Sequence, residues 1–127
     1  MGYLGNYCSV AEYIKYKYQI LIDGNTTAWE RAYWQLFSNS VIFKQNSNKI
    51  QWYYEGLKPW IHYIPIENDI SDLPEKIKWA LNNDEKVYEI SQNAQKFAHE
   101  NLNYEDILYY IYLLLTEYAK LQKFIVD

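Results

Sequence analysis

The chain has 127 residues, of which 50% are apolar and 22% charged, and its net charge is −4. This composition excludes a disordered or collagen-like chain and fits one domain with its own core. An acidic chain is also a poor candidate for sequence-independent binding to nucleic acid. The longest apolar run, residues 107–115, is too short for a membrane span, and the N-terminus offers no apolar stretch of the length of a signal-peptide core. We therefore expect no membrane span and favour a cytoplasmic location, with the compartment left open.

Cysteine and histidine are too scarce for a closed metal site. The chain has one cysteine, Cys8, and two histidines, His62 and His99, whereas a structural zinc site takes four such ligands. We expect no bound metal and no internal disulfide. Cys8 is interpreted as an incidental residue, with pairing to another chain as the alternative, and His99 as a solvated residue.

The aromatic and basic residues are unusual in number. Aromatic residues make up 19% of the chain, and arginine occurs once, at Arg31, against eleven lysines. An AT-rich genome is one explanation for this bias. Because only a guanidinium presents a planar fork that grips two oxygens, the single arginine is a candidate for a role that lysine cannot fill.

The first half of the chain alternates between predicted helices and strands. The strands are short apolar runs at 18–22, 41–44 and 60–66. The helices cover 10–14, 29–37 and 50–57. Ser9 is the predicted cap of the first helix, and Thr26 or Thr27 that of the second. This order predicts a parallel sheet with right-handed crossovers.

Beyond residue 66 the pattern is helical. Ser71 or Asp72 caps one helix, in which Pro74 stands at an early position where its missing N–H costs little. Its predicted apolar face consists of Ile77, Ala80 and Leu81. Asp84 begins the next helix, whose apolar side is predicted to consist of Val87, Ile90, Ala94 and Phe97.

The last predicted helix carries apolar residues at alternating steps of four and three. They are Ile107, Ile111, Leu114, Tyr118, Leu121 and Ile125. This spacing forms one continuous stripe. We expect the stripe to pack against the chain's own sheet and helices, with a partner protein as the alternative.

A parallel sheet places a candidate ligand site at the carboxyl ends of its strands, where a turn enters a helix. Here that turn is residues 23–27. Gly24 permits a tight turn and a close approach of backbone to ligand. The N–H groups that begin the helix favour an anion, the two threonine hydroxyls add donors, and Arg31 can grip two oxygens. These residues form a candidate diphosphate site, although the same strand–turn–helix also occurs without a ligand. Neither a Walker loop nor a G-x-G-x-x-G fingerprint is present.

Four stretches of the chain form an ordered set. They are K-Y-K-Y at 15–18 leading to D-G at 23–24; A-W-E-R at 28–31 with S-N-S-V-I-F-K-Q at 38–45; W-Y-Y at 52–54 through L-K-P-W-I-H-Y-I-P-I at 57–66; and D-I-S-D-L at 69–73 followed by K-W at 78–79 and N-D-E at 83–85. The set resembles the C-terminal half of glycosyltransferase family 90, which includes capsule-associated, lipopolysaccharide-modifying and Rumi-type protein O-glucosyltransferases. The block at 57–65 is its most specific part.

The resemblance implies an inverting, metal-independent transfer of a sugar from a UDP-sugar, without a further cofactor. It implies the α/β, Rossmann-like C-terminal lobe of a GT-B fold, with a short parallel sheet flanked by helices and a helical C-terminus. It also implies that the donor is contacted by the segment that ends in the arginine, with Arg31 on the diphosphate and Asp23 a candidate for donor hydroxyl groups. The expected donor-binding residues are Asp23, Gly24, Asn25, Thr26, Thr27, Ala28, Trp29 and Arg31.

Three further residues are candidates for positions near the donor. Lys44 follows the second predicted strand, and His62 and Tyr63 lie on the third. The alternatives are a solvated strand end for Lys44 and a hydrogen-bonded structural histidine for His62. The aromatic cluster at 52–54 is interpreted as packing rather than as a stacking surface for a sugar or base. A glycosylation sequon at 25–27 would obstruct the candidate site if it were modified, which weighs against a secretory location.

The chain departs from the family pattern in one respect. In the family, the general base is an acidic residue on an N-terminal acceptor lobe, and we expect residues 1–127 to be a single nucleotide-sugar-binding domain without that lobe. We assign no catalytic residue and expect the chain alone to be inactive, as a fragment, a truncated product or half of a split enzyme. Its expected partners are a nucleotide sugar and a separate N-terminal lobe or another protein. The alternative function is a non-catalytic remnant or interaction module that uses the exposed lobe interface.

Overall fold

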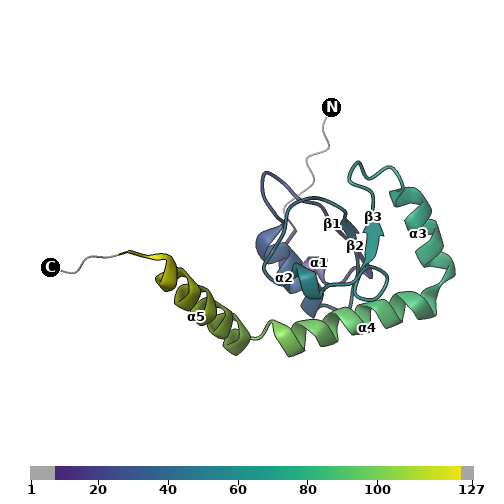
Figure 1. The fold of residues 1–127 in the computed structure, drawn as a ribbon. Coiled ribbons are helices and arrows are strands. Elements are labelled where there is room, and N and C mark those ends of the chain that lie inside the picture. Colours follow the sequence, from purple (N-terminus) through teal and green to yellow (C-terminus); the bar gives the residue numbers. More distant parts are fainter. Residues whose placement is uncertain (1–7, 124–127) are drawn as a thin grey trace.

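The computed structural model describes residues 8–123, with Trp29 described by its backbone alone. Helices and strands alternate in the first half, and the second half is helical (Figure 1). The elements are α1 Val10–Tyr13, β1 Tyr18–Leu21, α2 Trp29–Phe37, β2 Val41–Gln45, the 3₁₀ turn η1 Tyr54–Gly56, β3 Ile64–Ile66, α3 Leu73–Asn82, α4 Asp84–Asn101 and α5 Tyr104–Leu121. The predicted α/β class is confirmed.

The three strands form one parallel sheet in the order β1-β2-β3. Phe43, in the middle strand, lies opposite Ile20 of β1 and Ile64 of β3. All three strands therefore end at the same edge of the sheet, as the sequence predicted.

Two hydrophobic clusters cover the two faces of this sheet. Ile42 packs with side chains of α2, whereas its neighbours Val41 and Phe43 face the side of α3, because successive side chains of a strand alternate. Figure 1 shows α2 and α3 on opposite sides of the sheet. α4 contributes Ala94 and Ala98 to the first cluster and other residues to the second, so this helix joins the two halves of the core.

The starts of the helices differ partly from the prediction. Ser9 is the N-cap of α1, where the Glu12 carboxylate accepts from the Ser9 N–H and hydroxyl at 2.8 and 2.9 Å. The predicted threonine cap of α2 is wrong. Its N-cap is Ala28, and the N–H of Ala28 donates to Asp23 Oδ1 at 3.0 Å. The Asp23 carboxylate, which follows β1, therefore holds the N-cap residue in place, and among the described residues no side chain caps the first turn of α2.

Two predicted elements are much shorter in the structure. The helix expected over 50–57 is only the η1 turn, and the strand expected over 60–66 begins at Ile64. Trp60 has φ 62°, in the left-handed region, and its N–H donates to the Tyr63 carbonyl at 2.7 Å. The N–H of His62 donates back to the Lys58 carbonyl at 2.9 Å. Because these N–H groups bond within a turn, they cannot join the sheet.

The α3 helix follows its predicted pattern except at one position. Its N-cap is Asp72, and Pro74 lies in its first turn. Ala80 is completely buried, but Leu81 is 64% exposed. Adjacent helical positions differ by about 100° in direction, so the face that buries Ala80 turns Leu81 toward solvent.

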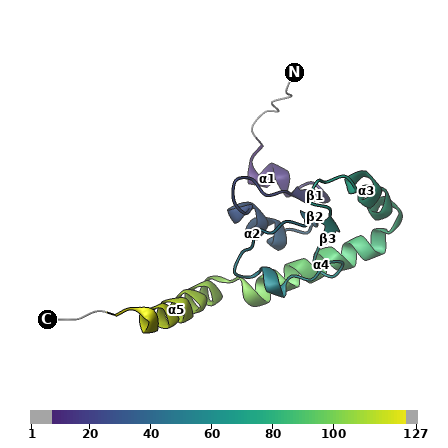
Figure 2. The same ribbon diagram turned by 45° about the horizontal axis from the view of Figure 1, so that its top comes forward.

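The prediction that the apolar stripe of the last helix packs against the chain's own sheet and helices is wrong. Figures 1 and 2 show α5 extending away from the sheet beyond the end of α4. Leu114 is 52% exposed and Leu121 79% exposed, and no α5 residue is buried. The chain breaks after α4 because Asn103 caps a new helix, with its Oδ1 accepting from the Asp106 N–H at 3.0 Å. Of the predicted stripe, Ile125 lies outside the described residues.

No described helix combines the length and the apolar composition that crossing a membrane requires.

Candidate functional site

The carboxyl edge of the sheet is held together by the side chain of Gln45, at the end of β2. Its Oε1 accepts from the Asp23 N–H at 3.0 Å, and its Nε2 donates to the Asn68 carbonyl at 2.6 Å. Asp23 follows β1 and Asn68 follows β3. One amide from the middle strand therefore binds the ends of both neighbours and fixes the floor of the candidate site.

Asp23 connects this floor to the start of α2. Its Oδ1 accepts from the Ala28 N–H at 3.0 Å, and its Oδ2 accepts from the Ser47 hydroxyl. A carboxylate has acceptor capacity for further donors. An incoming phosphate at the start of α2 would have to bind beside Asp23 or displace it, because the Ala28 N–H is already engaged.

The 24–27 loop is held from the segment that follows β2. Lys49 Nζ donates to the Gly24 carbonyl, and Gln51 Nε2 donates to Thr27 Oγ1 at 2.7 Å. Gly24 does not have a positive φ, and a Cβ added there would meet no atom within 4 Å. The glycine is therefore not required by the turn itself, and it leaves open space beside the loop. Asn25 and Thr26 are exposed at its tip, and the Trp29 side chain lies outside the described part of the chain.

Arg31 lies on the first turn of α2 and points back to the end of β1. Its Nη2 donates to the Ile22 carbonyl at 2.8 Å. Its side chain is exposed, and within residues 8–123 it forms no ion pair with a carboxylate. The guanidinium thus keeps its remaining N–H donors for a ligand.

Lys44 brings a second positive charge to the α2 face of the edge. Its Nζ lies 4.4 Å from the centre of the Tyr54 ring and 5.5 Å from that of Tyr63. Burial lowers the pKa of Lys44, and the Asp23 carboxylate opposes this effect. Burial also raises the pKa of Tyr54 to about 12 and raises the pKa of Tyr63, so both phenols stay neutral.

His62 has the contacts expected of a structural histidine. Its Nδ1 accepts from the Lys58 N–H at 2.9 Å, and its ring lies 5.2 Å from that of Phe97 in α4. Burial lowers the pKa of His62, and the Lys58 charge adds to this effect. These contacts turn the imidazole toward α4.

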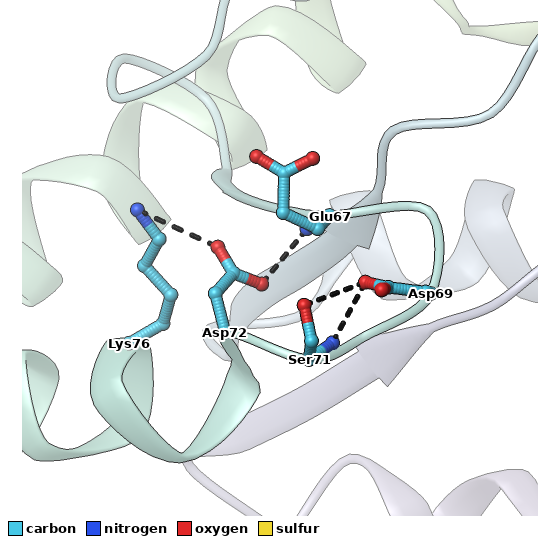
Figure 3. Close-up of polar contacts among 5 residues, drawn as sticks. All are labelled: Glu67, Asp69, Ser71, Asp72 and Lys76. Atoms are coloured by element: carbon cyan, nitrogen blue, oxygen red, sulfur yellow. Dashed lines mark hydrogen bonds and ion pairs between the residues drawn. The ribbon is translucent and has the colours of Figure 1, made fainter.

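The connection from β3 to α3 lies at the same edge and is shown in Figure 3. Asp72 Oδ1 accepts from the Glu67 N–H at 2.8 Å, and its Oδ2 lies 3.7 Å from Lys76 Nζ. Asp69 Oδ1 accepts from the N–H and hydroxyl of Ser71 at 3.0 and 2.6 Å. These carboxylates are used to shape the turn, and no described group of three acidic, histidine or cysteine residues could hold a metal ion.

A cavity of about 540 Å³ adjoins the site between η1 and the first half of α5. Trp52 and Tyr110 stack there with ring centres 4.4 Å apart. Tyr53 is 8% exposed, which confirms packing for that residue, but Trp52 is 38% exposed. The aromatic cluster is therefore only partly buried.

Three residues of the site were not singled out from the sequence. Ser47, Lys49 and Gln51 hold Asp23 and the 24–27 loop. The sequence does contain an indication of their position: a polar N-S-N-K run follows β2, and parallel strands end at one edge of the sheet. The bridging role of Gln45 depends on side-chain direction, which the sequence does not show.

The parallel sheet with helices on both faces and polar strand ends defines a Rossmann-like α/β domain. The model of glycosyl transferase family 90 matches residues 5–127, and the chain belongs to this family.

Among the proteins similar to this chain are several named protein O-glucosyltransferases. The chain is 40% identical over 121 residues to "Protein O-glucosyltransferase 2" of Danio rerio, a match that covers 95% of this chain and 24% of the relative. It is 39% identical over 111 residues to "Protein O-glucosyltransferase 3" of Homo sapiens, covering 87% of this chain and 22% of the relative. The chain thus spans about a quarter of the length of these relatives.

Proposed function

We propose that this chain is the donor-binding part of an inverting, metal-independent glycosyltransferase that uses a UDP-sugar. Family membership supports the transfer chemistry. The proposed location of the donor rests on one observation: the Gln45 side chain connects the ends of all three strands by hydrogen bonds. Arg31, Lys44 and Lys49 bring positive charge to the same edge of the sheet.

Each side chain of this edge has a role in the proposal. Arg31 grips two diphosphate oxygens with the donors that the Ile22 carbonyl does not use. Lys44 adds positive charge from a half-buried position, where a charge interaction is weakened less by solvent. Asp23 accepts from hydroxyl groups of the ribose or the sugar through its remaining lone pairs.

The proposal assigns no general base to this chain. An inverting transfer needs a base within hydrogen-bond reach of the acceptor hydroxyl, and the carboxylates of the described edge already shape turns and caps. The base and the acceptor site are therefore assigned to the portion of a family-90 protein outside these residues, and the chain alone is expected to be inactive. The relatives' names make glucose the proposed sugar and a protein the proposed acceptor.

The first test is calorimetric titration of UDP and UDP-glucose into the purified chain. We expect a Kd between about 1 μM and a few mM, and at least about a tenfold loss in Arg31→Ala. Arg31→Lys should recover only part of the loss, because an ammonium cannot grip two oxygens side by side. Lys120→Ala is the control, because it removes one positive charge from the exposed α5, away from the site. This variant should bind UDP and UDP-glucose as tightly as the unchanged chain does.

The exposed apolar residues of α5 favour a second candidate function, that of a protein-interaction module. The two functions predict different results. A chain that shows a cooperative unfolding transition but no UDP binding would overturn the donor-binding proposal. Self-association through α5 without nucleotide binding would establish the alternative.

A further inference from the structure

We propose that the cavity between η1 and the first half of α5 binds a hexose ring, at a site separate from the candidate donor site. The cavity has a volume of about 540 Å³. It is lined by Ile50, Gln51, Trp52, Tyr54, Glu55 and Tyr110. Its size and its mixture of aromatic rings with a few polar groups are typical of small-molecule sites. The fit to a hexose rests on these side chains, and only a role of that sugar in glycosyl transfer rests on the proposed function.

The apolar wall of the cavity is a pair of stacked rings. Trp52 and Tyr110 have ring centres 4.4 Å apart and planes that differ by 19°. The buried Tyr53 ring contacts Trp52 from another side, at an angle of 86°. Trp52 is held by both neighbours and is still 38% exposed. A hexose ring presents C–H groups on its face, and this apolar surface is removed from water when it packs on an indole.

The polar groups of the cavity have hydrogen-bonding capacity to spare. Tyr54 Oη is buried and has no hydrogen-bond partner within residues 8–123. Gln51 uses its Nε2 to donate to Thr27 Oγ1 at 2.7 Å, which leaves its Oε1 as an acceptor. Glu55 is exposed and forms no ion pair with a described basic residue. Because a sugar hydroxyl both donates and accepts, one ring can satisfy all three groups.

The same side chains disfavour other classes of ligand. Lys44 Nζ lies 4.4 Å from the centre of the Tyr54 ring and would repel a second cation, whereas the Glu55 carboxylate would repel an anion. A planar base would gain most between two rings, but Trp52 and Tyr110 already stack on each other. A purely apolar group would leave the Tyr54 hydroxyl unpaired. An uncharged ring with hydroxyl groups on its rim meets each of these conditions.

Gln51 is the connection between this cavity and the candidate donor site. It lines the cavity, and its Nε2 holds Thr27 of the 24–27 loop. The residues proposed to contact the donor, Asp23, Arg31 and Lys44, do not line the cavity. A hexose in the cavity would therefore lie beside the donor, and the two ligands should bind at the same time.

NMR titration of the isotope-labelled chain with methyl β-glucoside tests the site, because each of the five tryptophans gives its own indole N–H signal. We expect the Trp52 signal to shift in a saturable way, with a Kd between about 1 and 50 mM. Trp60 is the internal control. It is similarly exposed, at 42%, but packs against Lys76 and Trp79 of α3, so its signal should not move. Sorbitol, an open-chain polyol without a ring face, should give no saturable shift.

Two variants show whether the lining residues bind the sugar. Trp52→Phe identifies the Trp52 signal by its loss. Glu55→Gln removes a charged acceptor and should weaken binding at least about fivefold, while the exposed position keeps the fold intact. Glu75→Gln makes the same change at an exposed position of α3 and should bind methyl β-glucoside as the unchanged chain does.

Three results would overturn the proposal. They are no saturable shift of Trp52 up to about 100 mM glucoside, an equal loss of affinity in Glu55→Gln and Glu75→Gln, and displacement of the glucoside by saturating UDP. The last result would make the cavity part of the donor site. A glucoside shift in a chain that does not bind UDP would support this proposal and overturn the donor-binding function, and UDP binding without a glucoside shift would do the reverse.

Discussion

Gln45 and Asp23 show how few side chains are needed to hold the edge of a short parallel sheet. Gln45 spans the ends of three strands, and Asp23 ties the same edge to α2 and to Ser47. Three of these four hydrogen bonds, all except that from Gln45 to the Asn68 carbonyl, are partly shielded from water. Removal of one partner of a shielded bond leaves the other unsatisfied. The candidate site and the sheet edge are thus built from the same contacts.

Residue-scale chemistry also predicts a pH effect at His62. Burial and the Lys58 charge lower the pKa of His62 below its ordinary 6.5, and the Lys58 N–H donates to Nδ1, which requires that nitrogen to be unprotonated. Below pH 6.5 the unfolded chain therefore binds more protons than the folded one, and the free energy of unfolding falls as the pH is lowered through the folded-state pKa. Denaturant titrations between pH 7.5 and about 5 measure this slope.

The His62 prediction has a matched control. In His62→Asn the slope below pH 6.5 should be smaller than in the unchanged chain, because the titrating group is gone. His99→Asn removes the other histidine, which is exposed on α4, and should keep the slope. A slope unchanged in His62→Asn would show that other groups cause the acid sensitivity.

At the scale of elements, α4 and α5 contrast although each has 18 residues. α4 buries five residues, four of them in the two clusters, whereas α5 buries none. An apolar stripe therefore does not tell which surface it contacts, because the stripe of α5 is as regular as that of α4. What separates the two helices is the break at Leu102 and Asn103, which sends α5 away from the sheet (Figure 2).

This contrast predicts unequal costs of the same kind of truncation. Ile90→Ala removes a side chain that is 3% exposed and should lower the free energy of unfolding by about 2–5 kcal/mol. Leu114→Ala removes one that is 52% exposed and should change it by less than about 0.5 kcal/mol. Denaturant titration measures both. Similar costs at the two positions would mean that α5 packs on the domain in solution.

At the scale of the whole molecule, β2 is the structural centre. Its residues enter both hydrophobic clusters, and it pairs with both other strands. The two faces of the sheet cannot separate without breaking this strand. Residues 8–102 should therefore unfold in one step, with α5 outside that unit.

Hydrogen exchange of the isolated chain tests this. The amides of Ile42 and Phe43, although they belong to different clusters, should exchange only by global unfolding and show the same denaturant dependence. Amides in the second half of α5 should exchange at least about 100-fold faster, because local fraying opens them. Different dependences for Ile42 and Phe43 would show that the two clusters unfold separately.

Apolar runs and turn residues were sufficient to predict the α/β class, the parallel sheet and most helices, because strand and helix periods differ and Gly, Asn and Pro mark the ends. They also located the carboxyl edge that carries Asp23, Arg31 and Lys44. Four features were decided only in the tertiary structure: the bond from the Ala28 N–H to Asp23 at the start of α2, the turn at Trp60, the bridge by Gln45 and the direction of α5. Each depends on contacts between segments far apart in the chain or on a local break, and periodicity carries no information about either.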